Sequence, residues 1–294
     1  MLGNKPIKKI FSRVVALMLL ITPWFMGGLY AAEEGSERLT GEGIVSSCGI
    51  KSAGDDQRSR LTVVLQNSQQ GTEKRSVYRR YWKGYAGLDG VFDKMLLFTE
   101  YPPDALGSAF MRVSYVADVG KTADQWIYLP LLKKIRRVTI RDPADSFLNS
   151  DLTYADVGQR ALSADKHQFL GVKSVQGLDF LQVESVPVDL MSHYGKRIQW
   201  YLKGEGWDTC VSARIDYFTK DGVLSKVQFN KWQQINGAWV WDRVLVRNMI
   251  SGNISIFSVG DVDVNIGLKD ELFSARTLRI GPRALEGLAK KEDK

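Results

Sequence analysis

The amino-acid sequence predicts a mainly β protein built from many short antiparallel strands. Short segments alternate apolar and polar residues with a period of two, which is typical of strands. In Val223–Trp232, for example, Val227 and Phe229 share one face while Lys226 and Gln228 share the other. The hairpin signals "KDG" and "NG" stand on either side of this segment. Many such strands, separated by turn-rich stretches, indicate a sandwich, a barrel or one strongly curved sheet.

The chain begins with the features of a cleaved secretory signal peptide. A basic leader, Lys5–Arg13, precedes an apolar run, Val14–Leu29, and small residues then permit cleavage after Ala31 or Ala32. An uncleaved membrane anchor is the alternative, but the apolar run is shorter than the roughly 20 residues that a spanning helix needs. We therefore expect an exported protein with a signal peptide over residues 1–31 and a single β domain over 32–294.

The predicted elements of the mature chain are strands, with one helical segment before them, one among them and one after them. The helical segments are expected within Ser36–Gly49, Ala144–Val157 and Lys269–Leu278. The strands are expected at 60–67, 75–82, 94–101, 109–116, 125–130, 135–140, 179–187, 197–202, 223–232, 239–248 and 254–266. The last four of these segments predict an antiparallel meander.

Charge and composition narrow the range of functions. The formal net charge falls from +7 to about +3 on export, because the leader carries four basic residues and no acids. A charge this small does not favour polyanions in general. The basic cluster of Lys133, Lys134, Arg136 and Arg137 therefore does not predict a nucleic-acid partner. At 44% hydrophobic and 25% charged residues, the chain has the composition of an ordinary globular protein.

The cysteines and histidines of the sequence do not predict a metal site. Cys48 and Cys210 are the only cysteines, and export permits a disulfide between them, although two separate buried thiols fit the sequence equally well. His167 and His193 are isolated, and no residues have the spacing of metal ligands. We expect neither a metal nor a cofactor.

No sequence motif of a known catalytic machinery is present. The chain lacks a nucleophile elbow, a zinc-protease motif, a phosphate loop and a dinucleotide fingerprint. Asp142, Asp145, Asp151 and Asp156 follow the basic cluster. Carboxylates in such a series can act as acid and base or hold a cation. The simpler interpretation is that they cap turns and neutralise the neighbouring cations, and we expect no enzyme activity.

The aromatic residues favour a ligand-binding interior. Aromatic side chains make up 11% of the chain, and several recur at alternate strand positions, such as Trp126 with Tyr128 and Trp239 with Trp241. Ordinary core filling explains any one of them. A curved sheet of many strands can, however, enclose more volume than its own side chains fill. An exported protein of this class is therefore a candidate lipid binder.

The centre of the chain resembles the LolA-like outer-membrane lipoprotein-sorting protein family. The segment "DQWIYLPLLKKIRRV" and the following "SFLNSDLTYADV" carry the resemblance, which extends over most of the mature chain. The matching residues are Trp126, Tyr128, Leu129, Pro130, Arg136, Arg137, Ser146, Phe147, Asp151, Tyr154 and Asp156. Asn149 departs from the pattern, since the family has a glycine there.

The resemblance implies a periplasmic protein with an incomplete β-barrel whose open side is covered by short helices. Such proteins take acyl chains into an apolar cavity. The implied function is carriage of acylated cargo, a lipoprotein or a lipid, towards the outer membrane. The implied partners are an inner-membrane exporter of the resistance-nodulation-division type or an outer-membrane acceptor. A regulatory lipid-sensing module of the same fold, acting on a membrane partner, is the alternative, and a lipid- or glycan-acting enzyme using Asp151 and Asp156 is a weaker one.

The resemblance also suggests which residues contact the cargo. We expect Arg136 and Arg137 at the rim, bound either to Asp151 or Asp156 or to a lipid headgroup. The full set of candidate cavity and rim residues is Phe98, Phe110, Trp126, Tyr128, Leu129, Arg136, Arg137, Phe147 and Tyr154.

Overall fold

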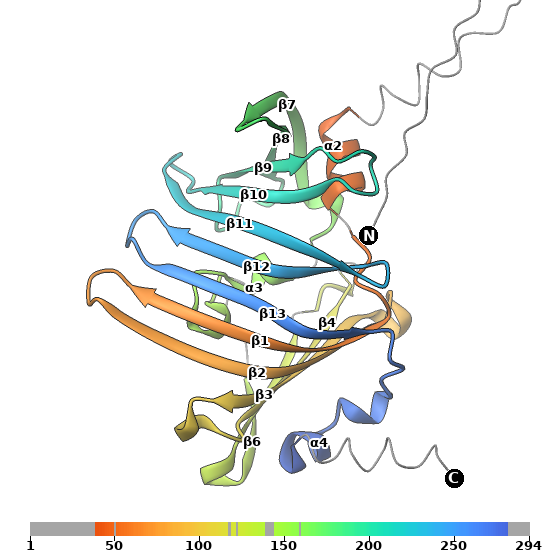
Figure 1. Ribbon diagram of the computed structural model, residues 1–294, viewed down its shortest axis with the longest axis vertical. Helices are drawn as coiled ribbons and strands as arrows, with labels where there is room; N and C mark the ends of the chain where they lie inside the picture. Colours follow the sequence, from red (N-terminus) through yellow and green to blue (C-terminus); the bar gives the residue numbers. More distant parts are fainter. Residues whose placement is uncertain are drawn as a thin grey trace, which may run out of the picture.

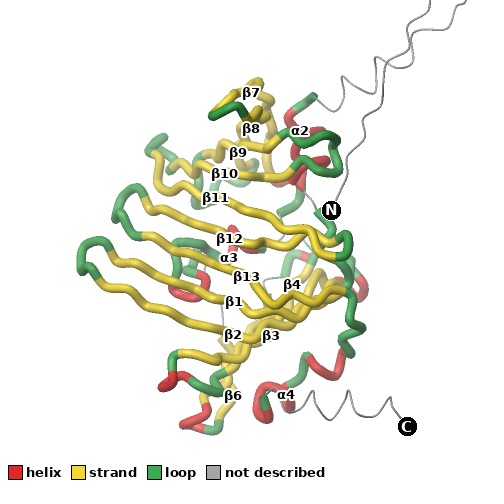
Figure 2. The backbone as a smooth tube through the Cα atoms, viewed as in Figure 1, coloured by secondary structure: helices red, strands yellow, loops and turns green. Residues whose placement is uncertain are grey.

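The computed structural model describes residues 39–49, 51–116, 119–121, 123–138, 144–158 and 160–281. The predicted signal peptide over residues 1–31 and Asp142 lie outside these residues. Most of the described chain is strand, and the helices are short (Figure 2). Within the described part, no helix combines the length and the apolar character needed to cross a bilayer.

Thirteen strands form one open antiparallel sheet, as the sequence predicts for its fold class (Figure 1). The strands of the first half are β1 (Asp56–Asn67), β2 (Thr72–Gly84), β3 (Val91–Tyr101), β4 (Ala109–Tyr115), β5 (Asp124–Leu129) and β6 (Lys134–Val138). Those of the second half are β7 (Asp165–Val175), β8 (Leu178–Pro187), β9 (Lys196–Leu202), β10 (Val211–Phe218), β11 (Leu224–Ile235), β12 (Ala238–Asn248) and β13 (Ile254–Val264).

The sheet consists of two meanders that meet at its centre. The first runs from β1 outward to β6 at one edge, and the second runs from β7 at the other edge back to β13. The two halves join where β13 pairs with β1, with Val259 opposite Leu61 and Phe257 opposite Val63. Because β6 and β7 are both edges, the sheet does not close into a barrel.

The connection from β6 to β7 must travel from one edge of the sheet to the other. It passes across the inner face of the curved sheet, where α3 (Tyr154–Val157) lies behind β12 and β13 in Figure 1. A 3-10 turn at Phe147–Asn149 precedes this helix, and a second one at Leu162–Ala164 follows it. The sequence predicts a helical turn here, and the structure confirms it. We call residues 144–158 the crossing segment.

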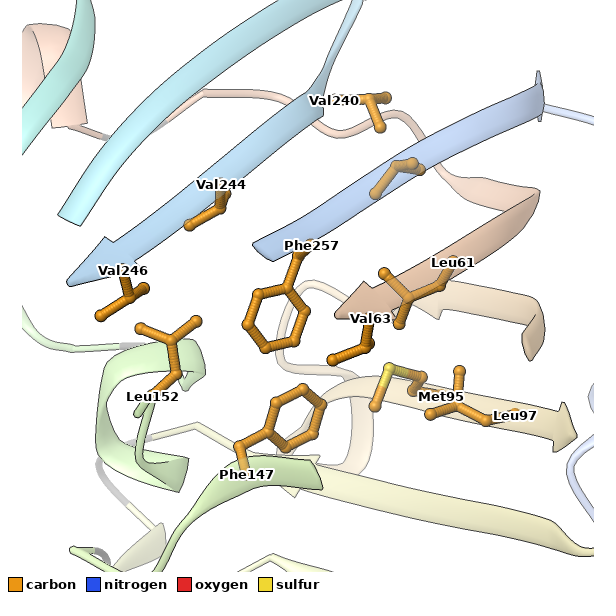
Figure 3. Close-up of a cluster of buried hydrophobic side chains, with 11 residues drawn as sticks. Leu61, Val63, Met95, Leu97, Phe147, Leu152, Val240, Val244, Val246 and Phe257 are labelled. Carbon is orange, nitrogen blue, oxygen red and sulfur yellow. The ribbon is translucent and has the colours of Figure 1, made fainter. Parts of the chain in front are cut away.

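The main core lies between the crossing segment and the centre of the sheet (Figure 3). Phe147 and Leu152 of the crossing segment face Val63 of β1, Met95 of β3 and Phe257 of β13. The rings of Phe147 and Phe257 stack with their centroids 6.4 Å apart. Burial of these side chains holds the segment against both meanders at once, at a gain of about 25 cal/mol for each Å² of apolar surface.

The outer face of the first meander has a core of its own. The C-terminal helix α4 (Ala275–Ile280) and the 3-10 turn before it place Leu272 and Leu278 against Leu96 and Phe98 of β3. The neighbouring residues Met95 and Leu97 of β3 belong to the inner core. Strand β3 is therefore buried on both faces, which explains its run of consecutive apolar residues.

A third core fixes the N-terminal helical segment to the second meander. Helix α2 (Gly41–Ile44) continues as the π-helical turn η1 (Val45–Gly49), and Ile44 packs with Leu181 and Tyr201. Thr40 caps the helix by accepting a hydrogen bond from the backbone N–H of Gly43. A disulfide joins Cys48 to Cys210 just before β10. The structure thus decides between the two alternatives that the sequence leaves open for these cysteines.

Two strands are missing from the sequence prediction, and a third has its polar face towards the interior. Strand β7 is an edge strand with a bulge at Gly171, and much of it is exposed, so its alternation is weak. In β10 polar and apolar residues are buried on both faces, so no alternation shows. In β11 Lys226 and Gln228 are the inward-facing pair, while Phe229 is 44% exposed on the outside. The polar half of this strand faces the interior.

Removal of the disulfide is predicted to weaken the attachment of the helical segment to the sheet. Because the bridge closes a chain loop of 162 residues, Cys48→Ser combined with Cys210→Ser should lower the free energy of unfolding by about 2–5 kcal/mol. Urea denaturation of the mature protein without reductant measures this loss. An unchanged midpoint would show that α2 is held by Ile44 packing alone.

Candidate ligand-binding cavity

Two adjoining cavities open on the inner face of the sheet. The larger, which we call the wide cavity, has a volume of about 560 Å³ and lies between η1, the crossing segment and β9–β10. The smaller, which we call the aromatic cavity, has a volume of about 360 Å³ and lies over β1–β3 and β11–β13. Lys51, Ala53, Trp82, Phe92 and Gly158 line both of them. Each volume falls in the range of small-molecule binding sites.

Tryptophan side chains from distant strands gather around the aromatic cavity. Trp82 comes from β2, Trp232 from β11, and Trp239 and Trp241 from β12. A register shift between Lys231 and Trp232 brings the Trp232 and Trp241 rings opposite each other, with centroids 6.2 Å apart. Phe147 and Phe257 complete the wall from the main core. This wall presents large apolar surfaces without filling the space in front of them.

The wide cavity has a more polar wall, centred on the buried Asp165. Arg160 forms two hydrogen bonds of 2.6 Å to its carboxylate oxygens, and Arg197 donates a further short one. Nearby, the Nδ1 atom of His167 lies 2.8 Å from Ser185 Oγ, whose hydroxyl also donates to Gln199. Burial alone would raise the pKa of Asp165, but the hydrogen bond from Arg160 and the charge of Arg197 lower it below its usual range.

Asp151 and Asp156 anchor the crossing segment to the second meander. The Asp156 carboxylate accepts hydrogen bonds from the backbone N–H of Thr153 and, at 2.5 Å, from Lys226 Nζ of β11. The Asp151 carboxylate accepts from Asn248 Nδ2 at 2.9 Å and Ser255 Oγ at 2.7 Å. Both acids therefore have structural partners, which favours a structural role over catalysis for this pair. They do not neutralise the neighbouring basic cluster as expected, since the cation that Asp156 binds is Lys226.

The ammonium group of Lys226 is buried next to an aromatic ring. Its side chain is 7% exposed, and its Nζ lies 4.6 Å from the centroid of the Tyr217 ring. Burial lowers the pKa of Lys226, and the carboxylate of Asp156 opposes that effect. Burial also raises the pKa of Tyr194, whose hydroxyl donates to Asp156 at 3.2 Å. The side chains of the Lys226–Asp156 pair are almost entirely buried between the sheet and the crossing segment.

The turn at Asn149 explains the one departure from the family pattern. Leu148 and Asn149 both have positive φ angles, of 52° and 60°. Glycine adopts this left-handed conformation most easily, and asparagine tolerates it better than other residues. Asn149 therefore keeps the backbone turn that a glycine would make.

The candidate site residues do not all meet at the cavities. Phe147 lines the aromatic cavity, while Phe110 and Tyr154 pack against the main core on the same face. Phe98, Trp126 and Tyr128, by contrast, belong to the outer core beneath α4. Because α4 covers them on the opposite face of the sheet, these three do not line either cavity. Leu129, at the end of β5, is also absent from the cavity walls.

The two rim arginines have different surroundings from those expected. Arg137 donates a short hydrogen bond to Asp124 on the outer face, where Tyr115 donates to the same carboxylate at 2.6 Å. Arg136 is exposed on the edge strand β6. The expected partners Asp151 and Asp156 instead bind residues of β11–β13. Burial would raise the pKa of Asp124, but its three hydrogen-bond donors hold it well below the usual range.

Several charged and aromatic residues of the cavity walls are not among the candidates predicted from the sequence. Arg80 and Trp82 occupy alternate positions of β2, and both face inward, as do Asp93 and Arg112. The period-two alternation of β2 places Arg80 and Trp82 on the same face of the strand. However, a strand with several arginines is typical of a protein surface. In the described residues, no cluster of histidine, cysteine and acidic side chains is able to hold a metal ion.

Comparison with known proteins places the chain among proteins of one fold. A family model described as an uncharacterized protein matches residues 92–280. A DUF1329 family protein from Desulfovibrio piger is 22% identical, with a TM-score of 0.70 over 81% of this chain and 97% of its own. A domain from Vibrio parahaemolyticus described as an outer membrane lipoprotein-sorting protein domain is 23% identical, with a TM-score of 0.68 over 81% and 98% of the two chains.

A more distant structure has the same architecture. A LolA superfamily protein from Nitrosomonas europaea is 16% identical, with a TM-score of 0.58 over 81% of this chain and 98% of its own. No curated protein matches the chain. At these identities, the structural similarities establish the fold.

Breaking the buried Lys226–Asp156 pair is predicted to destabilise the protein strongly. Asp156→Asn leaves the Lys226 ammonium enclosed without a counter-charge and should lower the free energy of unfolding by about 3–5 kcal/mol. The control is Asp263→Asn, whose partner Arg58 is 49% exposed, and this change should cost less than about 1 kcal/mol. Equal losses in the two variants, measured by urea denaturation, would contradict the anchoring role of Asp156.

The Asp165 network is predicted to contribute to acid sensitivity. Because the folded state lowers the pKa of Asp165, its contribution to stability is present above the unfolded pKa and is lost as pH falls through the folded pKa. Native protein should therefore exceed Asp165→Asn in stability at pH 7, and the difference should shrink below about pH 4. Denaturation midpoints from pH 7 to pH 2.5 measure it, and a constant difference would contradict the assignment.

Proposed function

Because the chain belongs to the LolA-like family, we propose that it is a periplasmic carrier of acylated cargo. The cargo is a lipoprotein or a lipid, held in the cavities of the inner face and carried towards the outer membrane. The domain that does this spans residues 32–294, after cleavage of a signal peptide over 1–31. The carrier is not an enzyme, and it needs no cofactor.

One observation carries this proposal: the inner face of the open sheet holds an apolar, aromatic-walled space next to a second cavity. Together Trp82, Trp239 and Trp241 offer flat apolar surfaces to a ligand in the aromatic cavity. An acyl chain entering such a space leaves water, and each buried methylene contributes about 0.8 kcal/mol.

The mechanism of such a carrier is passive. Cargo binds because its chain is removed from water, and it is handed on only when the acceptor binds it better. An inner-membrane exporter of the resistance-nodulation-division type supplies the cargo in this proposal, and an outer-membrane acceptor receives it. No covalent step is involved.

A regulatory lipid sensor is a second candidate, favoured by the surface of the β7–β8 edge. Val172, Leu178 and Val188 there are 52–56% exposed, and Leu190 is 87% exposed. An edge strand with exposed apolar residues suits pairing with another protein. A sensor would bind its membrane partner differently with and without lipid, whereas a carrier would transfer lipid between vesicles.

The carrier proposal predicts that the protein holds lipid when it is isolated. Native mass spectrometry of the mature protein from its own periplasm should show a bound amphiphile, which solvent extraction then identifies. Ala53→Trp places a large side chain where both cavities meet and should reduce the bound amount several-fold. Leu106→Trp, at a loop position that is 61% exposed, is the matched control and should leave it unchanged.

Two results would count against carriage. A clean mass without ligand, together with no uptake from phospholipid vesicles, would move the assignment to the sensor or to a purely structural role. Equal lipid content in Ala53→Trp and Leu106→Trp would place any bound lipid outside the two cavities.

A further inference from the structure

The wall of the aromatic cavity carries more positive than negative charge. Its charged residues in the described chain are Lys51, Arg80, Arg112 and Asp93, so three cations face one carboxylate. Lys51 is occupied elsewhere, since its Nζ donates to the backbone carbonyls of Ser47, Trp207 and Asp208 at 2.9–3.2 Å. The two arginines remain beside the cavity with Asp93 between them.

Asp93 accepts hydrogen bonds from only some of the N–H groups of Arg80 and Arg112. Trp82 Nε1 already donates to Asp93 Oδ2 at 3.1 Å, and Arg112 Nη2 lies 3.4 and 3.5 Å from the two carboxylate oxygens. Arg112 is 5% exposed, and its Nε has no hydrogen-bond partner. A buried charged donor without an acceptor is costly, and such groups in native proteins usually mark a missing partner.

Arg80 donates hydrogen bonds to two neutral side chains. Its Nη1 donates to Gln57 Oε1 at 2.7 Å and to Ser59 Oγ at 3.4 Å. Burial lowers the pKa of Arg80 to about 10; the charge of Asp93 opposes this shift and that of Arg112 adds to it. Arginine remains charged at neutral pH, so the cavity wall keeps an uncompensated positive charge.

The geometry points to a ligand with an anionic headgroup. We infer that Arg80 and Arg112 bind the carboxylate or phosphate of an amphiphile whose apolar chain lies against the tryptophans of the aromatic cavity. Guanidinium groups bind both anions through paired hydrogen bonds, so the two headgroups share one recognition chemistry. This inference rests on the proposed function and narrows its cargo to anionic amphiphiles.

The first test compares headgroups on the native protein and needs no variant. Binding of oleate, oleoyl lysophosphatidic acid and oleyl alcohol is followed at pH 8 through the fluorescence of the cavity tryptophans. Both anions should bind at least about tenfold more tightly than the alcohol, because a hydrogen bond to a charged group is worth that much or more. The tighter of the two anions identifies the headgroup.

The second test removes each guanidinium in turn. Arg112→Gln and Arg80→Gln should bring the affinity for oleate to within about twofold of that for oleyl alcohol, since the charge-assisted bonds are lost. Arg79→Gln is the matched control. It removes the same charge from the same strand, but Arg79 pairs with Glu100 on the outer face, so the preference for anions should persist. Circular dichroism and thermal melting establish that each variant is folded.

The possible outcomes separate this inference from the function on which it rests. Equal binding of the anions and the alcohol by native protein would overturn the headgroup inference and leave lipid carriage standing. Binding of none of the three probes would overturn lipid carriage itself. Loss of stability in Arg112→Gln with an unchanged preference in both arginine variants would show that the arginines serve only the fold.

Discussion

The pairing of β1 with β13 is the constraint on which the rest of the structure depends. It joins the first strand of one meander to the last strand of the other, so β6 and β7 become the two edges of one sheet. Strands that are neighbours in sequence thus lie at opposite edges, and the chain between them must cross the inner face. The sheet is open in the structure, and the crossing segment covers part of its inner face (Figure 1).

The crossing segment explains why polar residues face inward on so many strands. Phe147 and Leu152 supply the apolar contacts, but a short segment with little helix also leaves backbone groups that need partners. Asp151 and Asp156 bind Ser255, Asn248 and Lys226 across three strands and fix the segment in one position. The same mixture of apolar and charged side chains continues into the cavity walls. There Arg80 and Arg112 lie in the same wall as tryptophans, so the interior suits a ligand that has both an apolar part and a charged part.

The sequence predicts the local elements far better than their arrangement. Period-two alternation locates most strands because each alternating segment reports its own two faces, whereas the β1–β13 pairing joins segments about 200 residues apart and leaves no local trace. The residues of the cavity walls were even harder to predict from the sequence than the strand pairing. In β3 the run from Met95 to Phe98 is apolar on both faces, because the crossing segment covers one face and α4 the other. No pattern could therefore tell that Phe98, Trp126 and Tyr128 point away from the cavity. Likewise Arg79 and Arg80 are adjacent in sequence, but only the second faces the interior.

The central claim is that the inner face of the sheet holds an amphiphile against its tryptophan wall. A crystal structure of the mature protein with a fatty acid brominated near the middle of its chain tests this claim most directly, because bromine gives an anomalous signal wherever the chain lies. The account predicts a bromine peak in the aromatic cavity, near Trp82 and Trp241, with the carboxylate towards Arg80 and Arg112. A peak beneath α4 on the outer face, or no ordered bromine in a crystal grown with excess ligand, would contradict it.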